Sequence, residues 1–375
     1  MKKILFVTCT RADYGKLKSI ILNTQKNKKF NTKVFVSGMH NLKKYGYTYQ
    51  ELEVDKIKGI YRYNNQSRNM FMDQNFINTM KGFSPFIMKY KPDLVVIHGD
   101  RIEALACALT SILNNFRIAH IEGGELSGTL DEMLRHSISK LSHIHFVSNH
   151  KAKKRLVQMG EDKKKIFVVG SPDIDIILGK KLPKLTVTKN RYDINFQNFN
   201  LAILHPVTTE LQQQKKNAKI FFLSLFLSKL NYIIVLPNND IGSEIIIKEL
   251  KKYKDYKRFK IFPSLRFEHY LTILKNSNFI IGNSSSGIIE APYYNTKTIN
   301  IGSRQNKRFE SKIIININFN KRDILNSIKK ALNLKNKKIK KSFGIGNSAK
   351  KIEKIFLTSK IWNIPTQKIF VDLKK

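Results

Sequence analysis

Cysteine is scarce in this chain, with two residues in a sequence of 375. Both, Cys9 and Cys107, lie in apolar segments that predict core positions, which excludes a disulfide framework. Long apolar runs are lacking too. Residues 220–227 form one of the longest, whereas a bilayer-spanning helix needs roughly 20 apolar residues, so we expect no transmembrane segment. The apolar run at residues 4–7 predicts a first strand and not a signal peptide, which makes the cytoplasm the expected location.

Acidic residues are also few, with 28 Asp and Glu against 68 Lys and Arg and a formal net charge of +40. One interpretation is a polyanionic partner, such as nucleic acid or an anionic membrane surface. The other is a set of lysines scattered over solvated helix faces, as in residues 248–257. The chain lacks zinc-finger spacings and the aromatic signature of RNA-recognition motifs, so the second interpretation is favoured and no specific nucleic-acid partner is predicted. Such a field would still attract an anion the size of a nucleotide.

Sequence motifs for cofactors are missing as well. The first predicted strand is not followed by GxGxxG, so nothing indicates a nicotinamide cofactor. His136, His143 and His145 match no closed zinc spacing, and no cysteine joins them. We therefore predict neither a metal nor a cofactor.

The pattern that is present alternates short apolar runs with helical segments, in a chain long enough for two domains. This alternation is lost around residues 179–199, which predicts a linker there. The sequence therefore predicts an α/β protein with two Rossmann-like, doubly wound domains facing a cleft. We expect an N-terminal domain at residues 1–180 and a C-terminal nucleotide-binding domain at 181–358. A last segment, residues 359–375, is expected to pack back on the first domain.

Charged residues follow two neighbouring strands of the first domain. Asp100 and Arg101 come after the run at residues 93–97, and Glu122 and Glu125 come after the run at 117–121. Ligands bind beyond the carboxyl ends of parallel strands, and like charges gathered there are costly to fold. This stretch therefore predicts a functional site. Asp131 follows at the start of another helix, where helix capping is the alternative interpretation.

The second domain carries a serine-rich loop, Gly282-Asn283-Ser284-Ser285-Ser286-Gly287, between a strand and a helical segment. Hydroxyl and backbone N–H groups at such a position can bind phosphate oxygens, although a flexible loop with a capping serine is the alternative. Glu290 lies one turn further and could accept both hydroxyls of a ribose. His205 follows another strand, where a lone histidine is as readily structural as functional. Gly15 is expected at the entry of the first helix, with backbone N–H groups open to an anion.

Together these residues resemble one family, the hydrolysing UDP-N-acetylglucosamine 2-epimerases of sialic acid synthesis, in a bacterial form similar to the epimerase domain of the animal bifunctional enzyme. The resemblance covers nearly the whole chain and rests on ordered motifs that lie at predicted strand ends and helix starts. These motifs are Arg11-Ala12-Asp13-Tyr14-Gly15, His98-Gly99-Asp100-Arg101, His120-Ile121-Glu122-Gly123-Gly124-Glu125, Ser127-Gly128-Thr129 with Asp131, Arg135-His136, Gly170-Ser171-Pro172, His205-Pro206-Val207-Thr208-Thr209, Pro237-Asn238, Gly282-Asn283-Ser284-Ser285 and Gly302-Ser303-Arg304-Gln305.

The resemblance implies a glycosyltransferase-B arrangement, usually as a homodimer. It implies that the chemistry depends on Asp100, Glu122, Asp131, Glu132 and His205. It implies contacts to the substrate or its nucleotide at Arg11, Gly15, Arg101, His205, Asn238, Leu265, Ser284, Ser285, Glu290 and Arg304. Glu244 stands where the animal enzymes carry a lysine in their feedback-inhibitor site, so that regulation is not expected here.

The implied reaction is conversion of UDP-N-acetylglucosamine to N-acetylmannosamine and UDP through a 2-acetamidoglucal. The same motifs would serve a UDP- or GDP-linked 2,4-diacetamido-2,4,6-trideoxyhexose, as in legionaminate synthesis. A glycosyltransferase of the same fold, or a basic nucleic-acid-binding protein, are the remaining alternatives. The expected partners are thus a nucleotide sugar and a second copy of the chain.

Overall fold

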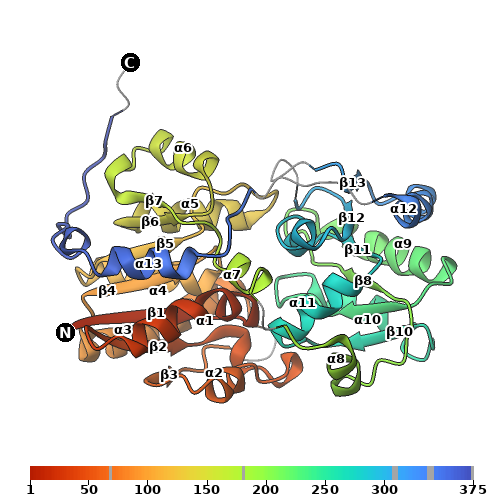
Figure 1. Ribbon diagram of the computed structural model, residues 1–375, viewed down its shortest axis with the longest axis horizontal. Coiled ribbons are helices and arrows are strands. Elements are labelled where there is room, and N and C mark those ends of the chain that lie inside the picture. Colours follow the sequence, from red (N-terminus) through yellow and green to blue (C-terminus); the bar gives the residue numbers. More distant parts are fainter. Residues whose placement is uncertain (67–69, 180–181, 306–310, 336–341, 373–375) are drawn as a thin grey trace. The chain divides into compact units, whose positions relative to one another are not determined.

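The apolar runs predicted as buried strands assemble into two parallel sheets, each in its own unit of the chain (Figure 1). The computed structural model describes residues 1–66, 70–179, 182–305, 311–335 and 342–372. Unit 1 comprises Met1–Glu125, Asp131–Gly179 and Ser342–Lys375, and unit 2 comprises Leu126–Leu130 and Lys180–Lys341. The predicted fold class, two Rossmann-like α/β domains, is confirmed.

The sheet of unit 1 has the strand order β3-β2-β1-β4-β5-β6-β7, and its paired strands are parallel. Its strands are β1 Lys2–Thr8, β2 Phe30–Val36, β3 Ile60–Arg62, β4 Leu94–His98, β5 Ile118–Ile121, β6 Ile144–Val147 and β7 Ile166–Val168. Its helices are α1 Arg11–Lys26, α2 Gln50–Val54, α3 Met72–Tyr90, α4 Ile102–Leu113, α5 Leu130–Leu141 (from Asp131 onward), α6 His150–Gln158, α7 Asp173–Ile177 and α13 Ser348–Phe356, with short 3-10 turns at Gly38–Asn41, Lys43–Tyr45, Lys163–Lys165 and Ser359–Ile361.

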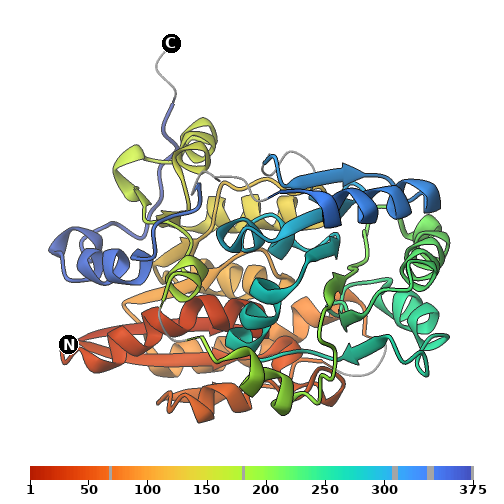
Figure 2. The same ribbon diagram turned by 45° about the vertical axis from the view of Figure 1, so that its right-hand side comes forward.

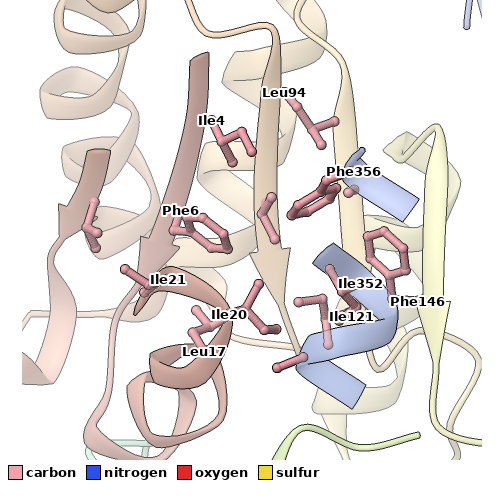
Figure 3. Close-up of a cluster of buried hydrophobic side chains, with 14 of the residues drawn as sticks. Ile4, Phe6, Leu17, Ile20, Ile21, Leu94, Ile121, Phe146, Ile352 and Phe356 are labelled. Carbon is pink, nitrogen blue, oxygen red and sulfur yellow. The ribbon is translucent and has the colours of Figure 1, made fainter. Parts of the chain in front are cut away.

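Helices cover both faces of this sheet, because its central strands are apolar on both sides. α3, α4 and α5 bury Phe83, Cys107 and Ile138 on one face. On the other face, α1 and α13 pack together against the strands. Figure 3 shows Ile352 and Phe356 of α13 lying among side chains of α1, β1 and β5.

The position of α13 differs from the predicted domain boundary at residue 358, because residues 342–358 lie in unit 1 and not in unit 2. The reason is packing. Phe356 meets Phe30 and Phe146 edge to face, with ring centroids 6.2 and 5.8 Å apart, so the apolar face of α13 completes the core of unit 1. The other predicted boundary, 180/181, falls outside the described residues.

Residues 361–371, here called the C-terminal strap, continue from α13 along unit 1. Arg117 Nε donates to the carbonyl of Ile364 at 2.5 Å, and Lys368 Nζ lies 2.6 Å from Oε2 of the buried Glu161. The N–H of Val371 donates to the carbonyl of Gly160 at 3.1 Å. The strap therefore lies on unit 1 over its described length.

The sheet of unit 2 has the strand order β10-β9-β8-β11-β12-β13, again with parallel pairs. Its strands are β8 Asn200–Ile203, β9 Tyr232–Val235, β10 Phe259–Phe262, β11 Phe279–Gly282, β12 Lys297–Ile301 and β13 Ile314–Ile317. Its helices are α8 Leu185–Arg191, α9 Gln214–Leu227, α10 Ser243–Lys251, α11 Phe267–Asn276 and α12 Lys321–Asn333, with 3-10 turns η4 Leu211–Gln213, η5 Ser285–Gly287 and η6 Ala291–Tyr294. Figure 2 gives a second view of these elements.

α9, α10 and α12 bury Phe221, Ile246 and Ile328 in one core of unit 2. The predicted linker around residues 179–199 is structured in part, since it contains α8. Thr188 of α8 is hydrogen-bonded to Nδ1 of His269 at 2.9 Å, which fixes α8 on α11. By length and hydropathy, none of the helices within the described ranges could cross a bilayer.

Candidate functional site

Each sheet has one point where its strand order reverses, and each point locates candidate site residues within its own unit. The reversal lies between β1 and β4 in unit 1 and between β8 and β11 in unit 2. Ligands of open parallel sheets bind beyond the carboxyl ends of the strands at such points. Asp100 follows β4, His205 follows β8 and Ser284 follows β11, so three predicted site residues occur where the topology favours a ligand.

Glu122 is a deeply buried carboxylate among those predicted for the site in unit 1. It follows β5 in a left-handed backbone conformation, with φ of +65° and 4% of its surface exposed. Its Oε2 lies 2.9 Å from Nζ of Lys16 and 3.1 Å from Nε2 of His98. Its Oε1 accepts a hydrogen bond from the hydroxyl of Ser171. An L-residue rarely adopts this backbone conformation, so the surroundings of Glu122 hold it in place.

The charges around Glu122 keep it ionised. Burial by itself raises its pKa, but the ammonium of Lys16 and the imidazole of His98 outweigh burial and hold the pKa well below the usual range. Lys16 also lies 3.6 Å from Oδ2 of Asp173, which is fully buried. One lysine is thus shared by two carboxyl groups.

Asp100 and Glu125 are joined by Arg135, which projects from α5 and is 2% exposed. Arg135 Nη2 donates to the carboxylate of Asp100, and Nη1 donates to the backbone carbonyl of Glu125 at 3.1 Å. The Glu125 carboxylate accepts from the hydroxyl of Ser148 at 2.5 Å. The side chain of Asp100 keeps 25% exposure, so it is the more open of these two carboxylates.

Asp131 and Glu132 lie in the first turn of α5 and are half-buried. Glu132 Oε1 is 3.7 Å from Nε2 of His136 one turn along the helix. Carboxylates are favoured at a helix N-terminus by the helix dipole, so this location fits a capping role as well as a catalytic one.

The predicted nucleotide contacts of unit 1 cluster less tightly. Arg11 Nε pairs with Glu51 at 2.6 Å, and Arg101 Nε lies 3.7 Å from Glu103. Gly15 is buried inside α1 and does not stand at its entry, contrary to the prediction. The helix begins at Arg11 because Thr10 caps it and exchanges hydrogen bonds with Asp13.

In unit 2, His205 is fixed by two asparagines. Asn283 is fully buried; it accepts from the His205 N–H at 2.7 Å and donates to the His205 carbonyl at 2.9 Å. Nδ1 of the His205 ring lies 3.2 Å from both the backbone nitrogen and Oδ1 of Asn238. Asn238 in turn donates to Asp240 at 2.5 Å. His205 and Asn238, both predicted to contact the substrate or its nucleotide, therefore contact each other.

The serine loop begins where β11 passes close to β8. Gly282 has φ of +133°, and a Cβ at this position would meet the carbonyl oxygen of Ile203 at 1.9 Å, so only glycine fits. Ser284 caps the turn η5, accepting from the Ser286 N–H at 3.3 Å. Tyr270 donates to the hydroxyl of Ser286 at 2.5 Å.

The other predicted residues of unit 2 surround this loop. Arg304 is 9% exposed and donates through Nη1 to the carbonyl of Asn283 at 3.2 Å. Glu290 and Leu265 are 5% and 4% exposed. Ser285 opens η5 and is half-buried. Asn283 thus joins His205 and Arg304, and His205 in turn contacts Asn238.

Sequence reasoning missed several residues that hold this site. Lys16, Asp173 and Tyr270 were given no role, and Ser171 and Asn283 stood in quoted motifs without one. Ser171 and Asn283 had a signal only as members of motifs, and Lys16, Asp173 and Tyr270 had none, because their partners are not neighbours in the sequence. Lys16 and Glu122, for example, are 106 positions apart.

The three histidines considered as metal ligands have other contacts in the structure. His143 is bonded to Ile118 N and to the Thr366 carbonyl, and His145 Nε2 lies 2.9 Å from Glu161. Among the described residues, no group of three or more His, Cys, Asp or Glu is arranged to hold a metal ion.

Comparison with known proteins adds independent information. The family described as UDP-N-acetylglucosamine 2-epimerase matches residues 22–357. The chain is 42% identical to the UDP-N-acetylglucosamine 2-epimerase of Neisseria meningitidis serogroup B over 376 residues, which cover 100% of both chains. It is 34% identical over 362 residues, 96% of each chain, to the UDP-N,N'-diacetylbacillosamine 2-epimerase (hydrolyzing) of Legionella pneumophila.

A solved structure of similar fold is that of the Methanocaldococcus jannaschii UDP-GlcNAc 2-epimerase in complex with UDP-GlcNAc and UDP. It matches with a TM-score of 0.79 at 23% identity, over 95% of this chain and 99% of that chain. At this identity the likeness establishes the fold.

Proposed function

Because this chain belongs to the UDP-N-acetylglucosamine 2-epimerase family, we propose that it is a hydrolysing 2-epimerase. It converts UDP-N-acetylglucosamine and water to free N-acetylmannosamine and UDP. The observation that carries the proposal is a pair of carboxylates that follow the adjacent strands β4 and β5. Asp100 is paired with Arg135, and the buried Glu122 is paired with Lys16. The name of the Legionella relative, which includes "hydrolyzing", supports the hydrolytic outcome.

The proposed reaction explains why carboxylates are needed. The hydrogen on C2 of the sugar is not acidic, since no carbonyl is attached to that carbon. Its removal is therefore coupled to departure of UDP from C1, with positive charge building on the ring. Anti elimination releases UDP and gives 2-acetamidoglucal. Water then supplies a hydroxyl to C1 and a proton to the opposite face of C2, which yields N-acetylmannosamine.

In unit 1, Glu122 fits stabilisation of the positive ring better than proton abstraction. A carboxylate whose pKa is held low is a weak base, but it keeps its negative charge throughout the reaction. Asp100, Asp131 and Glu132 are then the candidates for the base at C2. Arg11 and Arg101 are proposed to contact the nucleotide, and Gly15 to lie beside it.

In unit 2, the serine loop and His205 are proposed to bind the departing diphosphate. Hydroxyl groups of Ser284 and Ser285, together with the guanidinium of Arg304, can donate hydrogen bonds to phosphate oxygens. Glu290 is proposed to accept from the ribose hydroxyls. Asn238 and Leu265 complete the nucleotide contacts.

A second candidate keeps the mechanism and changes the sugar to a nucleotide-linked 2,4-diacetamido-2,4,6-trideoxyhexose. The observation that favours it is the 34% identity to the Legionella enzyme, over 96% of each chain. We give UDP-N-acetylglucosamine precedence because identity is higher, at 42%, to the Neisseria enzyme. A place in sialic acid or other surface-glycan synthesis, a homodimer and a cytoplasmic location belong to the same proposal.

The test is proton NMR of the purified protein with UDP-N-acetylglucosamine in heavy water. We expect free N-acetylmannosamine with deuterium at C2, formed together with UDP. A UDP-linked product that is never released would overturn the hydrolytic outcome. If the mixture stays unchanged, the UDP- and GDP-linked diacetamido sugars are tested next. Failure of all of them to react would refute the epimerase proposal. Release of free sugar without any acceptor excludes a glycosyltransferase.

A further inference from the structure

The turn formed by Gly170, Ser171, Pro172 and Asp173 has no part in the proposed reaction so far, although two of its side chains are fully buried beside Glu122. The turn follows β7 and leads into α7. Ser171 and Asp173 are both 0% exposed. A buried carboxyl group and a buried hydroxyl are costly unless they are bonded, so their partners show what the turn does.

The backbone of Ser171 is held on both sides by the segment that leads into α13. Its N–H donates to the carbonyl of Phe343 at 2.6 Å, and its carbonyl accepts from the hydroxyl of Ser348 at 3.2 Å. Gly170 has φ of +94°, and a Cβ there would meet the Ser348 hydroxyl at 2.8 Å. The position of Ser171 is therefore fixed by contacts that do not involve Glu122.

The side chains of the turn reach the two ends of the Glu122–Lys16 ion pair. Ser171 donates its hydroxyl to Oε1 of Glu122, while Nζ of Lys16 and Nε2 of His98 lie 2.9 and 3.1 Å from Oε2. Asp173 Oδ2 lies 3.6 Å from the same Lys16 ammonium. The turn thus orients the carboxylate through one oxygen and supplies a second negative charge to the lysine bound at the other.

We propose that Ser171 and Asp173 are positioning residues for Glu122 in the proposed reaction. Ser171 sets the orientation of the carboxylate through a fixed hydroxyl. Asp173 shares Lys16 with Glu122, which keeps the lysine from cancelling the negative charge that the reaction uses. Neither residue needs to touch the substrate.

The two residues act on Glu122 in opposite senses, and this gives the proposal a distinctive signature. A hydrogen bond to an ionised carboxylate lowers its pKa, so loss of the Ser171 hydroxyl raises the pKa of Glu122. A neighbouring negative charge raises the pKa, so loss of the Asp173 charge lowers it. A turn that merely supported the fold would give no such pair of opposite shifts.

The experiment compares Ser171→Ala, Asp173→Asn and the double variant, with Ser111→Ala as the control. Ser111 is also fully buried, but its hydroxyl only bonds the Cys107 carbonyl within α4. We expect Ser171→Ala to lower kcat by about 10- to 100-fold and to move the acid limb of its pH profile upward by about one unit. Adding Asp173→Asn should move that limb down again while kcat stays low. Ser111→Ala should match the parent protein.

A titration without substrate separates this inference from the proposed function on which it rests. The carboxyl carbons of ¹³C-labelled glutamate are followed by NMR against pH, and the Glu122 signal is assigned by its absence in Glu122→Gln. The Glu122 pKa is expected to be highest in Ser171→Ala. It should be lower in the double variant, and it should also be lower in the parent protein. Equal values in Ser171→Ala and Ser111→Ala, or a rise on adding Asp173→Asn, would overturn the positioning role. Failure of every nucleotide sugar to react would overturn the function and leave this titration valid.

Discussion

The two units of the protein build their candidate site residues from different interactions. In unit 1, the polar groups at the strand ends are mostly charged and paired, as in Glu122 with Lys16 and Asp100 with Arg135. In unit 2, His205 is held by hydrogen bonds with the neutral amides of Asn283 and Asn238. Both sheets have the same parallel topology, so the difference lies in the side chains that each sheet carries at its reversal point.

This difference matches the two tasks that we propose. Charge develops on the sugar ring during elimination, and fixed buried charges act most strongly on such a change. Recognition of a nucleotide needs donors and acceptors in fixed positions, which neutral amides and hydroxyls provide with a smaller desolvation cost. The predictions below test whether unit 1 depends on charge and unit 2 on hydrogen-bond geometry.

The largest effect is expected for Glu122→Gln, which removes the buried charge and keeps the size of the side chain. Turnover should fall by about 10²- to 10⁴-fold, because the positive ring loses its stabilising carboxylate. UDP release under saturating substrate measures this. Glu249→Gln is the matched control, since Glu249 is 4% exposed and pairs with Lys252 in unit 2. A loss of turnover in the control as large as that of Glu122→Gln would contradict the contrast between the units.

Unit 1 is expected to unfold first in acid. Burial lowers the pKa of His120 from 6.5 to about 3 and that of His40 to about 4, so the unfolded chain binds more protons between these values and pH 6.5. The stability of unit 1 should therefore fall as the pH drops from 6.5 toward 3. Glu161 adds to this loss of stability at the acid end. The hydrogen bond from His145 outweighs burial and lowers the pKa of Glu161 to about 2. Unit 2 has His205 and His269 as its only histidines.

The probe for this acid transition is Trp362, the single tryptophan of the chain, which donates its indole N–H to the Phe356 carbonyl in unit 1. As the pH is lowered, the fluorescence of Trp362 should change first. Pepsin should begin to cleave within unit 2 only at a lower pH. His120→Gln should move the fluorescence transition to lower pH. Simultaneous opening of both units at every pH would count against the contrast.

Asn283→Ala should act on unit 2 through hydrogen bonding alone. It leaves the N–H and carbonyl of His205 without their amide partner, at a cost of about 1–3 kcal/mol for each buried group. Affinity for UDP, measured by calorimetry, should fall, while the Trp362 signal of unit 1 keeps its urea midpoint. Asn300→Ala is the control, because Asn300 is 2% exposed in the same sheet and bonds Asn316 instead. Equal losses of affinity in both variants would point to general weakening of the sheet.

The smallest effect is expected for Lys368→Met, a charge of unit 1 that lies outside the site. Burial lowers the pKa of Lys368 from 10.5 to about 8, against the attraction of Glu161; Lys140, Lys165 and His145 also face this cluster. The folded state thus binds fewer protons than the unfolded chain between pH 8 and 10.5, and stability from this group rises with pH in that window. Urea unfolding at several pH values should show this rise in the parent protein and not in Lys368→Met.

The fold could be predicted well from the sequence because its strands are short, apolar on both faces and separated by helices. The ends of these strands also placed Asp100, Glu122, His205 and Ser284 correctly at the carboxyl edges of their sheets. The hydrophobic periodicity of a helix or strand shows which of its faces must be buried, but it does not show which other element that face packs against. This is why the predicted boundary at residue 358 puts α13 in the second domain, whereas α13 lies in unit 1.

The pairing of charges could not be predicted for the same reason. Nothing local to Lys16 indicates that it lies between Glu122 and Asp173, since these residues meet only after β1, β5 and β7 have joined one sheet. Gly15 shows the opposite limit. Thr10 and Asp13 have the spacing of a helix-capping pair, which predicts that α1 begins right after Thr10 and therefore before Gly15.

The return of α13 and the C-terminal strap to unit 1 has a consequence for synthesis of the protein. A ribosome makes residues 1–179 first, but the core that contains Phe30 and Phe146 is closed only by Phe356 and Ile361. Unit 2 has all its residues once position 341 has been made. The unit that starts first therefore finishes last, and a nascent chain carries an open apolar face on unit 1 until its final segment is translated.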